Sequence, residues 1–470
     1  MKLFISLFCL CFCFLFFLTL PNLIYSFEYT KDALLDQVLE LPGLNWSSGI
    51  NFNQFSGYLN LEGTSKYIHY WLVESESNPN NDQVNMQPVV FWTNGGPGCS
   101  GLLGFMTEQG PFRPDINGNL QQNPYAWNKI ANMIFLEQPI GVGFSYSDNK
   151  DDYKIGDDQT AQDNLATILA FIKRYPHFNQ TSLYITSESY GGHYMPTLAD
   201  TIIKYNDNIQ QNKINFKGFA VGNPYTDYYS GTGAQMETYW GKQLLPKPTW
   251  DIYLANNCTD PVQQLNSSVC EFLLLDFMKK IGNLNPYALD YPVCLTTQQK
   301  TLHQFIFNSN YLSSDYEPCE DNFATDYLNK PEVKTALHVH NNIEWTECSK
   351  TVKYNLADKM LPMEHYYKTI LNSKTHPDLR ILVYSGDDDG VCGTIGTQRW
   401  IYDLGFPVDS LWKTWYVDGQ VAGYITKFKT PYSKEDRLSF MTVHYAGHEV
   451  PTYKPKEALE LFSMYLNNKI

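Results

Sequence analysis

A serine in a strand-to-helix turn is the first residue of this sequence that could do chemistry. Ser189 follows the apolar segment 183–186 and precedes a helical pattern that begins at His193. A nucleophile elbow needs small residues two positions before and two positions after the nucleophile, so that the hydroxyl stands clear of the backbone. Ser187 and Gly191 meet that need, although Ser187 departs from the usual glycine. The alternative interpretation is an ordinary serine-rich loop.

Candidates for an acid and a base lie further along the chain, each after an apolar run. A serine hydroxyl is a poor nucleophile at its own pKa and needs a base, which in turn needs an acid to orient it. The run Asp387-Asp388-Asp389 follows the apolar segment 380–384, and His444 and His448 lie near the C-terminus. The chain order serine, aspartate, histidine is that of α/β hydrolases, whereas two unrelated protease folds reach the same geometry with other orders. We therefore expect a catalytic triad.

A glycine-dense loop could supply an oxyanion hole. Residues 94–101 read Asn-Gly-Gly-Pro-Gly-Cys-Ser-Gly and follow the apolar run 88–93. In α/β hydrolases one oxyanion amide comes from such a loop, and the other comes from the residue after the nucleophile, which is Tyr190 here. A phosphate-binding loop is the competing interpretation, but no Lys-Ser or Lys-Thr pair follows these glycines.

The elements that must position these residues alternate between strands and helices. Two aromatic and β-branched runs, 55–61 and 67–73, predict a hairpin. Short apolar runs predict strands that are buried on both faces of a parallel sheet, and they lie at 88–93, 133–137, 182–186, 218–221 and 380–384. Helical patterns lie at 160–175, 194–205 and 456–466. The predicted fold class is therefore α/β, with a mixed sheet flanked by helices as in α/β hydrolases.

One long stretch interrupts this alternation. Residues 225–348 hold five of the seven cysteines that lie beyond residue 26, and they show no clear strand. We interpret them as a cap insertion, stapled by disulfides, over the carboxyl edge of the sheet, where α/β proteins bind ligands. The α/β-hydrolase core then falls into two parts, 27–224 and 349–470.

The N-terminus predicts passage into the secretory pathway. Met1 and Lys2 precede an apolar run from Leu3 to Leu20, and residues 1–26 have the form of a cleaved signal peptide. An uncleaved signal anchor is the alternative, because about eighteen apolar residues come close to the length that spans a bilayer. After cleavage we expect no stable membrane association, and a secreted, lysosomal or vacuolar protein.

The composition excludes two classes of protein. Of the 470 residues, 18% are charged and 15% are aromatic, which is the opposite of the signature of a disordered chain. Acidic residues number 49 against 34 Lys and Arg, so the net charge of -15 repels phosphate backbones. We therefore expect no nucleic-acid partner.

Cysteines and sequons agree with an oxidising compartment. Seven cysteines remain after the signal, so six can pair and one thiol stays free, although the sequence does not set the connectivity. Asn-x-Ser/Thr sequons, each a weak signal by itself, predict glycosylation at Asn45, Asn179, Asn257 and Asn266.

Taken together, these segments resemble the serine carboxypeptidase family over nearly the whole chain after the signal. Further family-like runs lie at 123–128, 138–146 and 453–455. The resemblance implies a set of site residues by role: the triad Ser189, Asp389 and His448, the oxyanion donors Gly96 and Tyr190, and Asn94, Glu108 and Glu188 as the group that holds the substrate's C-terminal carboxylate.

The resemblance also implies how the cysteines pair. Similar proteins would link Cys99 to Cys348, Cys258 to Cys270 and Cys294 to Cys319, which leaves Cys392 as a free thiol near the substrate site. We hypothesise that thiol reagents inhibit the enzyme through Cys392. The alternative is a buried, inert thiol, which is the ordinary state of a free cysteine.

The implied pair of acids has a consequence for pH dependence. Two carboxylates cannot both stay ionised beside a third, because like charges at close range raise at least one pKa. A protonated Glu108 or Glu188 can donate a hydrogen bond to the substrate terminus, which predicts the strongest binding at acidic pH. From its residue type alone, Glu108 could instead pair with a nearby cation.

We therefore expect a serine-type carboxypeptidase that cleaves peptide and protein C-termini through an acyl-enzyme, without a metal or an organic cofactor. The sequence has no His-Glu-x-x-His zinc motif. Apart from substrate, the one partner we consider is a second copy of the chain in a homodimer. The alternatives are an acyltransferase on the same fold and a catalytically inactive secreted homologue that acts as a binding protein or chaperone.

Overall fold

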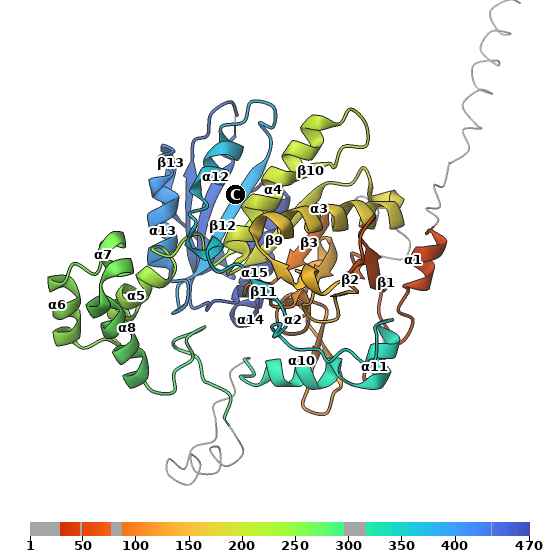
Figure 1. Cartoon of the computed structure of the whole chain (residues 1–470), viewed down its shortest axis with the longest axis horizontal. Coiled ribbons are helices and arrows are strands. Elements are labelled where there is room, and N and C mark those ends of the chain that lie inside the picture. Colours follow the sequence, from red (N-terminus) through yellow and green to blue (C-terminus); the bar gives the residue numbers. More distant parts are fainter. Residues whose placement is uncertain (1–28, 48, 77–86, 296–315, 434) are drawn as a thin grey trace, which may run out of the picture.

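The computed structural model describes residues 29–47, 49–76, 87–295, 316–433 and 435–470. Within these residues, eleven strands form one mixed sheet, and helices cover both of its faces (Figure 1). The predicted α/β class is thus confirmed. The predicted signal peptide, residues 1–26, lies outside the described residues.

The sheet is parallel in its centre and antiparallel at both ends. Its strands pair in the order β1-β2-β6-β3-β9-β10-β12-β15-β14-β13, and β7 pairs with β2. The strands from β6 to β15 are parallel to one another, so their carboxyl ends lie at one edge of the sheet. In sheet order the bounds are β1 Gln54–Asn60, β2 Lys66–Val73, β6 Asn132–Leu136, β3 Val89–Thr93, β9 Leu183–Glu188, β10 Phe216–Gly222, β12 Arg380–Gly386, β15 Leu438–Val443, β14 Gln420–Phe428 and β13 Val408–Val417, with β7 at Tyr146–Ser147.

Two hydrophobic cores lie on the two faces of this sheet. Successive residues of a strand point to opposite faces, so in β3 Val89 and Phe91 join one core and Val90 and Trp92 join the other. The first core packs against α3 (Asp157–Arg174), α4 (Gly191–Asn208), α12 (Glu364–Leu371) and α13 (Thr394–Asp403). The second packs against α2 (Gly101–Leu103), α10 (Glu320–Leu328), α11 (Pro331–Ala336), α14 (Val450–Tyr453) and α15 (Pro455–Leu466).

The hairpin of β13 and β14 is the largest element that the sequence patterns did not predict. β13 is an edge strand, and most of its side chains are exposed on both faces. Leu411 and Trp412 are neighbours in the chain and both face solvent. A strand shows an alternating pattern only when one face is buried, so the periodicity that marks an amphipathic strand is missing here.

The predicted insertion, residues 225–348, contains described residues of two kinds. Helices α5 (Gln235–Gly241), α6 (Lys247–Ala255), α7 (Pro261–Asn266) and α8 (Ser268–Lys280) stand to one side of the sheet, in green in Figure 1. Of these, α5, α6 and α8 pack around a small core of their own, which includes Met236, Tyr239 and Phe277. In contrast, α10 and α11 belong to the second main core. The boundaries of the insertion stay a prediction.

Three disulfides staple the described residues. They join Cys99 to Cys348, Cys258 to Cys270 and Cys294 to Cys319, which are the pairs that the family resemblance implies. Cys258–Cys270 closes the core of α5 to α8, whereas Cys99–Cys348 spans 249 residues of sequence and ties the glycine-dense loop to the chain after α11. Cys392 is the free cysteine and is buried.

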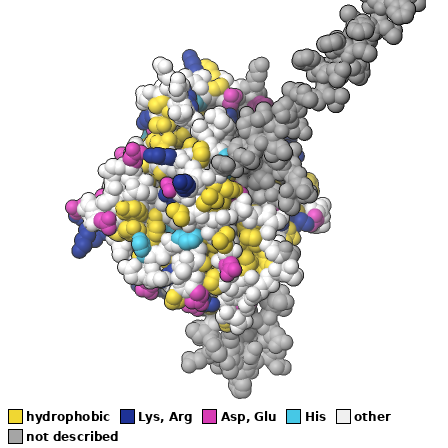
Figure 2. Space-filling view, turned by 90° about the vertical axis from the view of Figure 1, so that its right-hand side faces the viewer, with side chains coloured by type: hydrophobic (Ala, Val, Ile, Leu, Met, Phe, Trp, Pro, Cys, Tyr) yellow, Lys and Arg dark blue, Asp and Glu magenta, His cyan; other side chains and the backbone are white. Residues whose placement is uncertain are grey.

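Charges of both signs are mixed on the face shown in Figure 2. Acidic and basic side chains are interspersed there with apolar and neutral ones.

In the part of the chain that the structure describes, none of the helices has the length and apolar character needed to span a bilayer.

The contact of α15 with Trp127, in the second hydrophobic core, predicts a large effect on stability. The rings of Trp127 and Phe462 stack at 3.9 Å between centroids, and both side chains are buried. We expect Phe462→Ala to lower the free energy of unfolding by about 3–5 kcal/mol, because it removes a ring from a packed core and leaves a cavity. Glu460→Ala, on the exposed side of the same helix, should change it by less than about 0.5 kcal/mol. Urea unfolding of the two variants measures the difference; equal effects would contradict it.

Candidate active site

Ser189 lies at the turn between β9 and α4, in a backbone conformation that few residues adopt. Its φ is 58°, in the left-handed region, which costs a residue other than glycine about 1–3 kcal/mol. Two hydrogen bonds hold the turn: Ser189 N–H donates to the Gly222 carbonyl at 3.0 Å, and Tyr225 N–H donates to the Ser189 carbonyl at 2.8 Å. Such strain at a strand-to-helix turn is typical of a nucleophile elbow.

The small residues around Ser189 are required by the packing of the turn. A Cβ on Gly191 would lie 2.2 Å from the hydroxyl oxygen of Ser187, so these two positions touch across the elbow. The Ser187 hydroxyl donates to the Thr93 carbonyl at 2.6 Å. The elbow is therefore fastened to the end of β3, where the glycine-dense loop begins.

His448 and Asp389 form a close pair at the carboxyl edge of the sheet. His448 Nδ1 lies 2.6 Å from Asp389 Oδ2, and both side chains are almost completely buried. Asn223 Nδ2 donates to the same carboxylate oxygen at 2.7 Å, and the amides of Val391 and Cys392 donate to Oδ1 at 2.6 and 3.1 Å. Four donors therefore hold Asp389 in one orientation, with one oxygen facing the imidazole.

The structure joins His448 to Asp389 but places no hydrogen bond between His448 and Ser189 within the described residues. Because Nδ1 faces Asp389, Nε2 is the imidazole nitrogen that can serve a nucleophile. Ser189 is half-buried at the end of β9. Hydrogen bonds between nucleophile and base are often long in free enzymes and shorten when substrate binds.

The glycine-dense loop packs directly against the elbow. A Cβ on Gly95 would lie 2.4 Å from the amide nitrogen of Tyr190 and 2.9 Å from Ser189 Cβ, so the loop can approach this closely only without a side chain. Among the described groups, the amides of Gly96 and Tyr190 have no hydrogen-bond acceptor. Two unoccupied amides beside a serine hydroxyl are suited to stabilising an oxyanion.

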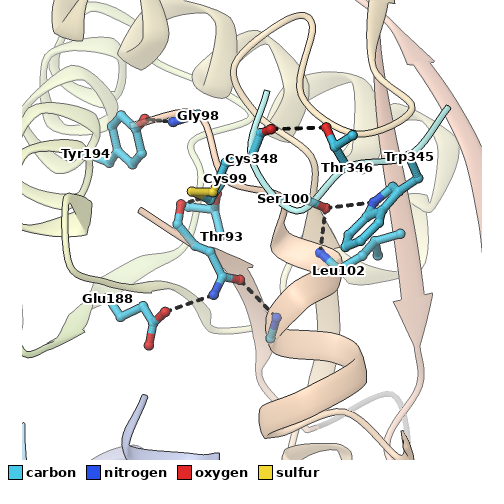
Figure 3. The surroundings of a disulfide bond; sticks show 12 residues. Thr93, Gly98, Cys99, Ser100, Leu102, Glu188, Tyr194, Trp345, Thr346 and Cys348 are labelled. Carbon is cyan, nitrogen blue, oxygen red and sulfur yellow. Dashed lines mark hydrogen bonds between the residues drawn. A yellow bond between two sulfur atoms is a disulfide. The ribbon is translucent and has the colours of Figure 1, made fainter. Parts of the chain in front are cut away.

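The loop is fixed from its far side as well, as Figure 3 shows. The Tyr194 hydroxyl accepts a hydrogen bond from Gly98 N–H at 3.2 Å, and the disulfide of Cys99 and Cys348 follows directly. Ser100 then caps α2 by accepting from Leu102 N–H at 3.1 Å. Together with the hydrogen bond from Ser187 to the Thr93 carbonyl before it, these contacts restrain the loop on both sides of the Gly96 amide.

Asn94, Glu108 and Glu188 meet in one buried cluster. Asn94 Nδ2 donates to Glu108 Oε1 at 3.0 Å and to Glu188 Oε1 at 2.9 Å, and its Oδ1 accepts from Trp92 Nε1 and Gly104 N–H. All three side chains are at most 4% exposed. The sequence also allowed Glu108 to pair with a cation, but its carboxyl contacts Asn94.

Burial governs the protonation of this cluster. Loss of hydration raises the pKa of Glu108 to about 7, against the opposing effect of the hydrogen bond from Asn94. Burial also raises the pKa of Glu188 well above its ordinary value, and the charges of Glu108 and Glu449 raise it further. The two carboxyls therefore hold at least one proton at mildly acidic pH.

The remaining predicted residues have simpler surroundings. The Cys392 thiol is buried, and burial, with the charges of Asp389 and Glu188, raises its pKa well above the ordinary value. Its reactivity toward thiol reagents stays a prediction. Of the predicted glycosylation positions, Asn45, Asn257 and Asn266 are exposed and Asn179 is half-buried.

Sequence reasoning missed several residues that support the site. Asn223 follows the end of β10, and its position after a buried strand was a usable signal. Tyr287 accepts a hydrogen bond from His448 N–H at 2.6 Å through its carbonyl, and its ring packs edge-on against the imidazole at 5.1 Å. Nothing local in the sequence marks Tyr287, because its role depends on the docking of a distant segment.

The assembled groups can carry out acyl transfer at a serine: a hydroxyl on a strained turn, an imidazole oriented by a carboxylate, and two free amides. In the described part of the chain, no group of three or more His, Cys, Asp or Glu side chains could hold a metal ion.

Comparisons with known proteins agree with this geometry. A family model described as serine carboxypeptidase matches residues 42–468. Serine carboxypeptidase 24 of Arabidopsis thaliana is 36% identical over 466 residues, which cover 96% of this chain and 95% of that protein. Serine carboxypeptidase-like 26 of the same plant is 35% identical and covers 92% of this chain and 93% of that protein.

A solved structure shares the fold. The crystal structure of Kex1(Δp), a prohormone-processing carboxypeptidase from Saccharomyces cerevisiae, superposes with a TM-score of 0.76 at 22% identity. The match covers 93% of this chain and 96% of that one. At this level of identity, the likeness shows the fold alone.

The contact of Gly95 with Tyr190 predicts that a single methyl group disables the serine. We expect Gly95→Ala to reduce the rate at which a fluorophosphonate labels Ser189 by at least about 100-fold, because the Cβ would displace the elbow and the amide beside it. Gly241→Ala is the matched control, since a Cβ there meets no atom within 4 Å. Labelling of folded Gly95→Ala at the rate of the control would contradict the expectation.

Proposed function

This chain belongs to the serine carboxypeptidase family, and we propose that it removes C-terminal amino acids from peptides and proteins through an acyl-enzyme, most actively at acidic pH. The observation that carries the proposal is the contact of Asn94 with two buried carboxyls, that of Glu108 and that of Glu188, the last residue of the strand that leads into the elbow. A protonated carboxyl in this cluster can donate a hydrogen bond to a substrate that ends in a free carboxylate.

The proposed reaction begins with Ser189. His448 Nε2 takes the hydroxyl proton as Ser189 attacks the last peptide carbonyl, and Asp389 stabilises the imidazolium through the contact at Nδ1. The amides of Gly96 and Tyr190 stabilise the tetrahedral oxyanion. Removal of one oxyanion-hole donor from an enzyme typically raises the activation free energy by roughly 2.7–4 kcal/mol. His448 then protonates the leaving amine, and water releases the acyl group by the same steps in reverse.

The cluster of Asn94, Glu108 and Glu188 provides the preference for a chain terminus. A substrate carboxylate placed beside two ionised glutamates would be repelled, because all the charges are buried together. With a proton on Glu108 or Glu188, the same site donates a hydrogen bond to the substrate carboxylate, while Asn94 holds the two glutamates side by side. An internal peptide segment offers no carboxylate to this cluster, so exopeptidase cleavage is favoured over internal cleavage.

The setting of the proposed activity follows from the first residues of the chain and from its cysteines. We propose that residues 1–26 direct the protein into the secretory pathway and are removed, and that the protein acts outside the cell, in a lysosome or in a vacuole. Three disulfides and exposed sequon asparagines support this setting.

A product assay tests the reaction and separates it from its alternatives. We expect the protein to shorten peptides one residue at a time from a free C-terminus. It should cleave C-terminally amidated versions of the same peptides more than about 100-fold more slowly, and Ser189→Ala should cleave neither kind. Transfer of an acyl group from an ester donor to an alcohol, without peptide cleavage, would instead support an acyltransferase. No cleavage and no phosphonate labelling of Ser189 would support an inactive homologue.

The raised pKa values predict the pH dependence. The pKa of Glu108 is raised to about 7 and that of Glu188 is raised well above its ordinary value, so the cluster gains a negative charge at Glu108 as the pH rises through about 7, and this charge repels the substrate carboxylate. We expect the KM for a free-carboxylate peptide to rise about tenfold for each pH unit above 7, while it stays low at pH 5. Glu188→Gln, which keeps a hydrogen-bond donor at every pH, should flatten this rise. A flat profile in the wild type together with unchanged kinetics in Glu188→Gln would overturn the role of the pair.

A further inference from the structure

Three consecutive aspartates follow β12, and each binds a different part of the molecule. Asp387 accepts hydrogen bonds from His444 Nδ1 at 2.6 Å and from Tyr445 N–H at 2.8 Å. Asp389 orients His448. Asp388, which lies between them and is completely buried, faces neither histidine. Its partners, Lys242 and Asp290, lie instead at the two ends of the segment 242–290, which follows α5 and includes helices α6 to α8.

Asp388 binds that segment at two points. Its Oδ1 forms an ion pair with Lys242 Nζ, and its Oδ2 accepts a hydrogen bond from Asp290 N–H at 2.9 Å. Lys242 Nζ also lies 3.0 Å from Asp290 Oδ2, so the cation bridges the two acids. Among the described residues, Lys242 is the cation paired with Asp388.

Lys242 is well anchored on its own side. It follows the last residue of α5, and its amide donates to the Thr238 carbonyl at 2.9 Å. α5 contributes Met236 and Tyr239 to the small core that the disulfide Cys258–Cys270 closes. The cation is therefore presented to Asp388 by a stapled unit, and its side chain is only 26% exposed.

The segment 285–291 passes from Asp388 to the imidazole. Leu289 N–H donates to the Asp388 carbonyl at 3.0 Å, and the Pro286 carbonyl accepts from Gly390 N–H at 3.0 Å. Two residues before Leu289, the Tyr287 carbonyl accepts the backbone N–H of His448, and the Tyr287 ring packs on the imidazole. The segment thus contacts the loops of both His448 and Asp389.

Close packing leaves this segment little freedom. A Cβ on Gly447 would lie 2.3 Å from the Tyr287 carbonyl oxygen, and a Cβ on Gly390 would lie 2.8 Å from the Pro286 carbonyl oxygen. A displacement of residues 286–290 therefore reaches His448 through direct contact, without an intervening flexible side chain.

We propose that Lys242 is a positioning residue for His448, acting through Asp388 and the segment 285–291. The cation does not touch substrate or the reacting atoms. It neutralises a buried carboxylate next to the triad aspartate, and it holds together the two acids that fix the segment packed on the imidazole. This inference rests on the proposed function, in which His448 is the general base.

The physical reason for an effect on rate is the cost of an unpaired buried charge. Removing one partner of a buried ion pair leaves the other without compensation, so the surrounding chain must move or the carboxyl must take up a proton. Either outcome changes the contact of Asp388 with Asp290, and with it the position of Tyr287 against the His448 imidazole. Misplacement of a catalytic group by about 1 Å can cost roughly 100-fold in rate.

The test compares kcat per active site in variants of Lys242. Active sites are counted by titration with a fluorophosphonate, and kcat and KM are measured on a peptide with a free C-terminus. We expect Lys242→Met to lower kcat by about 10- to 100-fold with a smaller change in KM, because Asn94, Glu108 and Glu188 lie on other elements. Lys242→Arg, which keeps the cation, should restore kcat to within about threefold of the wild type.

Lys247→Met is the matched control, since Lys247 forms an exposed ion pair with Asp251 in α6 of the same unit. It should leave kcat within about twofold of the wild type. If Lys242→Met folds poorly, Lys242→Met/Asp388→Asn removes the unpaired charge as well, and its kcat should exceed that of the single variant.

Two outcomes would overturn the proposal. One is a kcat per titrated site in Lys242→Met equal to that of the control, even if the variant melts at a lower temperature, because Lys242 would then act on stability alone. The other is a loss that Lys242→Arg does not restore. Failure of the proposed function is separate, because it would show as a wild-type protein that cleaves no peptide.

Discussion

The parallel pairing of β9, β10, β12 and β15 is the constraint on which the site depends. Each of these strands is hydrogen-bonded to the next in register, so all four end at the same edge of the sheet. The first residue after each end is tied to the neighbouring strand: Ser189 N–H donates to Gly222, Asn223 N–H to Tyr384 and Asp387 N–H to Val443. Backbone bonds therefore bring residues separated by up to 259 positions in the chain into one site, which reduces the dependence on flexible side chains.

The edge of the sheet also gathers acids away from water, and each is stabilised in a different way. A buried carboxylate is costly unless it is paired, hydrogen-bonded or protonated. Asp389 receives donors on both oxygens, whereas Glu108 and Glu188 share one amide and keep a proton because burial raises the pKa of both. Asp388 has a cation. The role that each acid can play follows from whether it is hydrogen-bonded, protonated or paired with a cation.

Much of the site could be predicted because its residues follow strands that are apolar throughout. The order of Ser189, the Asp387–Asp389 run and His448 needed only the strand patterns and the order of the three types along the chain. The choice of Asp389 and His448 within their runs, and the disulfide pairs, came from the family resemblance, since spacing does not fix which neighbour faces inward. The roles of Lys242 and Tyr287 could not be predicted, because they arise from the docking of the segment 242–291 against the loops that follow β12 and β15.

The departure of Ser187 from the usual glycine has a structural reason. The residue two before a nucleophile must be small, and in this chain it stands opposite Thr93 in the parallel pair of β3 and β9. Its hydroxyl donates to the Thr93 carbonyl, one residue before Asn94 and three before Gly96. A glycine would satisfy the steric need but would leave that carbonyl without this donor. The serine therefore ties the strand that carries the proposed nucleophile to the strand that leads to the oxyanion amide. If the end of one strand shifts, the end of the other shifts with it, and the distance between Ser189 and the Gly96 amide is preserved.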